Sequence, residues 1–90
     1  MKVDILGKTE DKLKMEDVER KIKAAAAKTN VPVQIHMTNN FRAFAQHSFN
    51  PSLTPIVFMD GEIEFQGSVQ DVAIIQQKLI ELRDKGSQTF

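Results

Sequence analysis

The stretch LTPIVFMDGEIEFQG, residues 53–67, decides the fold of this 90-residue chain. Residues 55–59 are apolar on both faces, as in a strand that is covered from two sides, so we place this strand in the middle of a sheet. Asp60-Gly61 is a strong hairpin turn signal, and residues 62–66 alternate apolar with polar side chains after it. The two runs are therefore predicted to pair as an antiparallel hairpin.

The residues before this hairpin predict two further strands with a helix between them. Residues 3–6 are rich in branched side chains, and residues 33–37 alternate as in the half-buried strand at a sheet edge. Apolar positions at helical spacing from Met15 onward predict a first helix. It should end near residues 29–30, because Pro32 disfavours a helical conformation in the residue that precedes it.

Two more helices are predicted from helical spacing. One covers residues 41–48, between Asn39-Asn40 and Asn50-Pro51, and its aromatic side chains are assigned to the core. The last helix begins at a Ser68 cap. Its expected buried stripe is Val69, Val72, Ile75, Leu79 and Leu82. Ile74 falls opposite this stripe, where it would mark a dimer or partner contact or a single exposed apolar residue.

The order of elements is strand, helix, strand, helix, strand, strand, helix. A helical crossover joins parallel neighbours and the hairpin adds an antiparallel strand. We therefore predict an α/β fold with a four-stranded mixed sheet and three helices that lie on both of its faces. Residues 1–85 form a single domain, and residues 86–90 are expected to be a flexible tail.

Composition excludes several classes of function. Twelve basic residues balance twelve acidic ones, and because they are interleaved we expect no nucleic-acid partner. No apolar run approaches the roughly 18 residues that would span a bilayer, so we expect no membrane partner and a cytoplasmic protein. The chain has no cysteine and therefore no disulfide or thiolate metal site. His36 and His47 have no second ligand at a recognisable spacing, and we predict no metal site.

One stretch resembles a known family. Residues 53–62, LTPIVFMDGE, with FQG at 65–67, resemble the Thr-Pro, apolar strand, Asp-Gly hairpin and closing glycine of thioredoxin-like proteins. The order of predicted elements is also that of the minimal thioredoxin fold. Within that family the chain is most similar to the small redox-active disulfide proteins, which are thioredoxin- or glutaredoxin-like. The resemblance implies a cis peptide bond at Thr54-Pro55.

The same resemblance implies a Cys-x-x-Cys motif after the first strand, and this chain has no cysteine there. Without a gap, the two positions fall on Glu10 and Leu13. In a loop two residues longer they fall on Lys12 and Met15. We prefer the second register because Met15 lies on the predicted buried stripe, whereas Leu13 points the opposite way. Neither register supplies a thiol, so the residues of this chain cannot act as a dithiol oxidoreductase.

Two places suit a ligand. The loop of residues 7–14 leads into a helix N-terminus and carries lysines, which favours an anion. Glu10 and Asp11 offset part of that positive field, and Thr9 or Asp11 would serve as the helix cap. The second place is the ledge at Thr54-Pro55. By the resemblance, this ledge presents backbone groups to an extended peptide or a glutathione-like ligand.

We therefore expect a redox-inactive binding module rather than an enzyme, with no cofactor. It would recognise a protein segment or a second copy of itself through Lys12, Met15, Thr54 and Pro55. An alternative is the binding or turnover of a small anionic ligand at the N-terminus of the first helix, where Lys12 supplies the charge. A second alternative is a structural remnant of a thiol-disulfide oxidoreductase.

Overall fold

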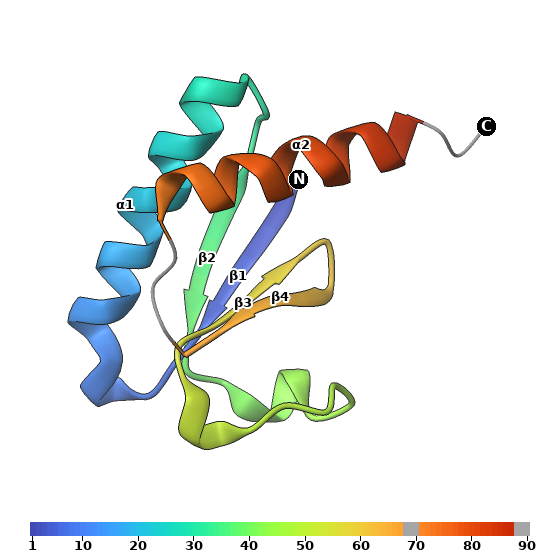
Figure 1. Cartoon of the computed structure of the whole chain (residues 1–90). Coiled ribbons are helices and arrows are strands. Elements are labelled where there is room, and N and C mark those ends of the chain that lie inside the picture. The colour runs from blue at the N-terminus through green and yellow to red at the C-terminus, as the bar shows by residue number, and fades with distance from the viewer. Residues whose placement is uncertain (68–70, 88–90) are drawn as a thin grey trace.

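The centre of the computed structural model, which describes residues 1–67 and 71–87, is a mixed four-stranded sheet (Figure 1). Its strands are β1 (Lys2–Leu6), β2 (Gln34–Thr38), β3 (Ile56–Met59) and β4 (Glu62–Gln66). They lie in the order β2-β1-β3-β4, with β1 parallel to β2 and antiparallel to β3. The predicted mixed sheet, with the apolar strand β3 inside it, is confirmed.

The hairpin of β3 and β4 turns where the sequence predicts it. Asp60 and Gly61 both have positive φ angles, 50° and 87°, as a two-residue hairpin turn requires. The turn is tied to β1 because the Asp60 carboxylate accepts a hydrogen bond from the Lys2 backbone N–H at 2.9 Å. The hairpin tip therefore lies at the end of β1 where the chain begins.

Helix α1 (Lys12–Thr29) connects the two parallel strands. Its buried residues are those of the predicted stripe: Met15, Val18, Ile22, Ala25 and Ala26. The helix begins three residues before Met15, directly after a 3-10 turn, η1 (Thr9–Asp11). It ends at Asn30, whose N–H donates to the carbonyl of Ala26. The left-handed φ of 56° at Asn30 then lets the N–H of Val31 donate to the same carbonyl at 3.2 Å.

Helix α2 (Val72–Ser87) packs its predicted stripe onto the sheet. Ile75 and Leu79 are 2% and 0% exposed, whereas Ile74 is 45% exposed on the opposite side. The helix continues two residues past the expected domain boundary at residue 85. The predicted cap at Ser68, the stripe residue Val69 and residues 88–90 of the expected tail lie outside the described residues.

The prediction of an α-helix over residues 41–48 is wrong. The segment forms a four-residue 3-10 helix, η2 (Phe41–Phe44), and a second short one, η3 (Pro51–Leu53), follows. Asn40 makes no side-chain cap for η2, and its backbone N–H instead donates to the Thr38 hydroxyl at 3.0 Å. A helix of eight residues is marginal without a cap, so contacts of its phenylalanines with the sheet decide the local structure.

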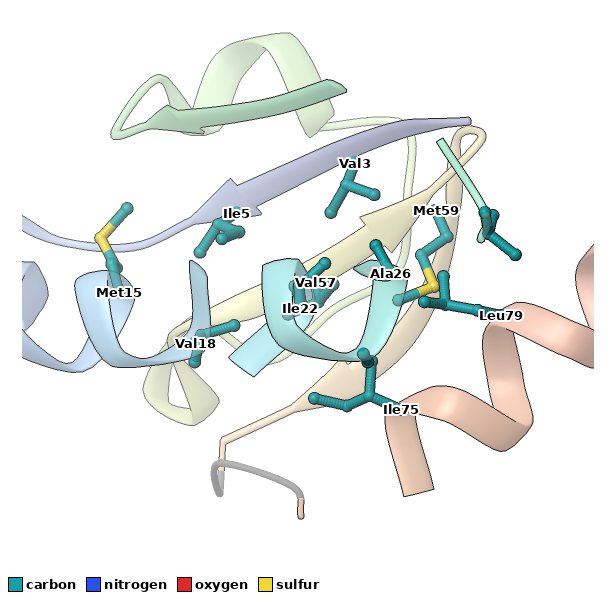
Figure 2. Packing of buried hydrophobic residues seen from close by; sticks show 12 residues of the cluster. Val3, Ile5, Met15, Val18, Ile22, Ala26, Val57, Met59, Ile75 and Leu79 are labelled. Atoms are coloured by element: carbon teal, nitrogen blue, oxygen red, sulfur yellow. The ribbon is translucent and has the colours of Figure 1, made fainter. Parts of the chain in front are cut away.

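The two faces of the sheet are covered differently, and the prediction of helices on both faces needs correction. Both α-helices cover one face, where α1 and α2 side chains point toward Val3 and Ile5 of β1 and Val57 and Met59 of β3 (Figure 2). On the other face, Leu6, Ile56 and Phe58 are covered by half-buried aromatic side chains of the segment with η2. These are Phe41, Phe44 and Phe49. Within the described residues the chain has two α-helices rather than three.

Candidate functional site

The loop between β1 and α1 closes tightly onto the end of β2. The N–H of Gly7 donates to the carbonyl of Thr38 at 3.1 Å. A Cβ atom on Gly7 would lie 2.6 Å from the sulfur of Met15, so a side chain there would displace Met15. Glycine at this position therefore allows Met15 to fill the space beneath the loop.

Asp11 ties this loop to the segment that precedes β3. Its carboxylate accepts hydrogen bonds from the Thr54 hydroxyl at 2.6 Å and from the Lys8 backbone N–H at 3.0 Å, and its residue is only 7% exposed. The bond from Thr54, followed by the bond from Lys8, lowers the pKa of the Asp11 carboxyl below its usual value, burial opposes this shift, and the charges of Lys14 and Lys8 add to it. Asp11 is thus a buried, ionised bridge between two loops.

This arrangement corrects the expectation that Thr9 or Asp11 caps the first helix. Asp11 occupies the N-cap position of α1 but makes no side-chain hydrogen bond there, because its carboxylate turns back to Lys8 and across to Thr54. Sequence analysis missed the Asp11–Thr54 bond, since the two residues are 43 positions apart. The position of Asp11 at the start of the first helix had suggested a helix cap, and that role is wrong because its side chain makes no cap bond.

A cleft of about 330 Å³ lies on the β2 side of the same loop. Its lining comes from the loop and α1 on one side, and from the end of β2 on the other. The lining residues are Gly7, Lys8, Thr9, Lys12, Met15, Met37, Thr38 and Asn39. Two methionines thus give the cleft apolar surface, and two lysines give it positive charge.

Two of the four predicted site residues meet in this cleft. Lys12 is exposed and Met15 is 7% exposed, whereas Leu13 is 80% exposed on the other side of α1. The helix thus buries Met15 and exposes Leu13. This is the orientation on which we preferred Lys12 and Met15 over Glu10 and Leu13. Lys12 and Met15 are one turn apart at the start of α1, and both line the cleft.

The other two site residues, Thr54 and Pro55, do not line the cleft and lie on the β3 side of the loop. Their peptide bond is cis. Pro55 is buried and its carbonyl accepts from the N–H of Gly67 at 3.1 Å. Thr54 is half-buried and extended, with φ −76° and ψ 151°, and Leu53 before it is 45% exposed.

The backbone carbonyl of Thr54 is free of internal bonds within the described part of the chain. Among residues 1–67 and 71–87, no group donates a hydrogen bond to the Thr54 carbonyl, and the Thr54 N–H directly follows the single turn of η3. Its hydroxyl, by contrast, is engaged by Asp11. Backbone groups without an internal partner must bond to water or to a ligand, which makes Thr54 the point of this ledge that is open to a main-chain partner.

The two histidines lie away from this site. On the edge strand β2, His36 has a side chain that is 67% exposed, and its Nδ1 lies 3.6 Å from a carboxylate oxygen of Asp4. His47 follows η2, in a segment that forms no α-helix. Its ring packs 5.1 Å from that of Phe58. Within the described part of the chain, no group of three acidic or histidine side chains could hold a metal ion.

Fold and site together define a class: a thioredoxin-like domain with a proline ledge and no thiol at the start of its first helix. A family model described as a thioredoxin domain matches residues 1–80, so the chain belongs to the thioredoxin domain family. Comparison with curated proteins and with solved structures found no match. Neither of the two helices, in the portion that the structure covers, is long and apolar enough to cross a membrane.

Proposed function

We propose that this protein is a redox-inactive binding module that holds an extended segment of a partner protein on the ledge at Thr54-Pro55. The observation that carries the proposal is the unpaired backbone carbonyl of Thr54, a residue in an extended conformation. An extended peptide can donate a main-chain hydrogen bond to this carbonyl, as an added strand does at a sheet edge. This mode of binding needs no thiol.

The surroundings of the ledge suit such a segment. Leu53 is 45% exposed and offers apolar surface to a side chain of the segment. Asp11 holds the Thr54 hydroxyl at 2.6 Å, so the ledge is already ordered before a partner arrives. An ordered site lowers the conformational entropy that is lost on binding.

Selection from a displayed library of random peptides tests the proposal. We expect selected peptides to bind the wild-type protein, to shift the amide resonance of Thr54 and to slow its hydrogen exchange. Pro55→Ala should weaken binding at least tenfold, since it releases the backbone that presents Thr54. Ile74→Ser, far from the ledge in the sequence and on the outer side of α2, is the matched control and should bind as the wild type does.

Circular dichroism and thermal unfolding of Pro55→Ala show whether the variant is folded. If the variant is not folded, the change in the Thr54 amide resonance when a peptide binds the wild-type protein tests the proposal without the variant. Peptides that bind without changing the Thr54 resonance would contradict the proposal, and so would a library that yields no binder.

The cleft favours a second candidate, the binding of a small anion at the start of α1. Lys8 and Lys12 line the cleft, and Lys12 supplies the charge in this case. Inorganic phosphate, acetate and glutathione at millimolar concentration should then raise the melting temperature, because a ligand that binds only the folded state stabilises it. The absence of any shift would exclude this candidate.

A further inference from the structure

The charged side chains in the described lining of the cleft beside the ledge are all basic. Lys8 and Lys12 lie in its wall, and none of its described lining residues is acidic. The exposed carboxylates of the neighbouring sequence, Glu10 and Glu16, are outside this lining. Met15 and Met37 form the apolar part of the same wall.

Asp11 forms no ion pair with these lysines, although the charges of Lys14 and Lys8 contribute to the lowering of its pKa. Its carboxylate is engaged by the Thr54 hydroxyl and the Lys8 backbone rather than by a lysine ammonium group. In the described residues, the side chains of Lys8, Lys12 and Lys14 form no ion pair. Farther along α1, three of the four basic side chains pair with acids about one turn away: Arg20 and Lys21 with Asp17, and Lys23 with Glu19.

A second groove on the molecule shows the opposite charge. It lies between β4 and α2, and its lining has four carboxylates, Glu62, Glu64, Glu81 and Asp84, against two lysines, Lys78 and Lys85. Lys78 in this groove is already paired with two of these carboxylates, at 3.7 Å and 3.5 Å. The lysine cleft is thus a local feature of one end of the sheet rather than the average surface of a chain with zero net charge.

The ledge and the cleft are close enough for one segment to reach both. Thr54 and the backbone of Lys8 donate to the same oxygen of Asp11, at 2.6 Å and 3.0 Å. Lys8 also lines the cleft. The two surfaces are therefore separated by the width of one loop.

We infer that the segment held on the ledge is acidic: it carries an Asp or Glu side chain that binds between Lys8 and Lys12, next to an apolar side chain that packs on Met15 and Met37. This inference rests on the proposed function, because the ledge anchors the segment. Charge complementarity of this kind selects among partners and speeds association more than it adds affinity. Binding should weaken when salt rises from about 50 mM to about 300 mM, where the Debye length is shorter.

The test is a parallel selection of random peptides on two proteins, the wild type and Lys8→Glu/Lys12→Glu. The wild type should enrich Asp and Glu next to an apolar residue, and the variant should enrich Lys and Arg at the same positions. Calorimetry should show at least a tenfold loss when a peptide selected on the wild type is offered to the variant. Lys28→Glu/Lys85→Glu changes the net charge equally, away from the cleft, and should keep wild-type affinity within about twofold.

The outcomes separate this inference from the proposed function. Peptides that shift the Thr54 amide but show no acidic enrichment would overturn the inference and leave the proposed function in place. A selection without binders would overturn both. An equal loss in Lys28→Glu/Lys85→Glu would show a general charge effect and overturn the inference.

The acidic groove of a second copy is a competing occupant. If the wild-type protein self-associates in sedimentation velocity and Glu62→Lys/Glu81→Lys abolishes this, the cleft takes a second copy and the inference of an acidic peptide segment is overturned. A wild-type protein that stays monomeric while it binds acidic peptides supports the inference.

Discussion

The two faces of the sheet are built on different principles. On the helix face, aliphatic side chains of α1 and α2 pack on Val3, Ile5, Val57 and Met59, all of them nearly inaccessible to solvent (Figure 2). On the loop face, Phe58 is buried by half-buried aromatic rings from a segment with little regular structure. Periodic packing of helices therefore stabilises one face, and a few large aromatic contacts stabilise the other.

The largest expected effect comes from a truncation on the helix face. Leu79→Ala removes a side chain that is 0% exposed between α2 and the sheet. We expect a loss of about 2–5 kcal/mol in the free energy of unfolding, because the lost burial is added to the cost of a cavity. Urea unfolding followed by circular dichroism measures it. A loss below about 1 kcal/mol would show that the packing of α2 contributes little to the free energy of unfolding. The helix face would then not be the more stabilising of the two faces.

A truncation on the loop face should cost less. The Phe44 ring lies 4.6 Å from that of Phe58 but is half-buried, so Phe44→Ala removes only part of a full burial. We expect a loss of about 1–2 kcal/mol, below that of Leu79→Ala. Amide exchange should quicken in residues 41–49 and stay unchanged in α1, as in local opening. Equal acceleration in α1 would mean that the two faces unfold as one unit.

The same contrast explains how much of the fold could be predicted. Apolar residues at helical spacing identified the buried stripes of α1 and α2, because each helix is long enough for its pattern to be clear. Phe41 and Phe44 are also three positions apart, but this spacing fits a 3-10 turn as well as an α-helix. Phe44 contacts Phe58, and Phe41 packs against the cluster that Phe58 forms with Leu6 and Ile56, so the partners of both come from other parts of the chain, which a local pattern does not contain.

The candidate site was predictable in part for a related reason. Helix phase placed Met15 inside and Leu13 outside, and the Thr-Pro motif pointed to the ledge. The bond from Thr54 to Asp11 joins residues 43 positions apart and leaves no mark in either neighbourhood. The cleft was hidden in the same way, since Met37 comes to Met15 only through the pairing of β2 with β1.

The bonds of Asp11 join the loop before α1 to the segment after η3. Replacing Asp11 therefore measures how much this bridge contributes to the free energy of unfolding. Asp11→Asn keeps the shape but loses the charge, so we expect a loss of about 1 kcal/mol near neutral pH. The pKa of Asp11 is lowered in the folded state, so this stabilisation is present above the unfolded pKa. It disappears as the pH falls through the folded pKa.

Urea midpoints of the wild type and of Asp11→Asn, measured from about pH 7 to about pH 2, should therefore converge toward low pH. Glu10→Gln is the control, since it neutralises an exposed carboxylate on the neighbouring residue. A constant difference between the wild type and Asp11→Asn would show that the charge of Asp11 has no part in the bridge.

The smallest expected effect lies on the outer side of the helix face. Ile74 is 45% exposed and points away from the buried stripe that packs on the sheet, so Ile74→Ser should change the free energy of unfolding by less than about 0.5 kcal/mol. Single exposed apolar side chains are common on protein surfaces, and the sedimentation coefficient should also stay the same. If Ile74→Ser dissociates an oligomer, then the outer side of α2 is itself covered by a partner. The helix face would then be buried on both sides of α2, and its stability would depend on protein concentration.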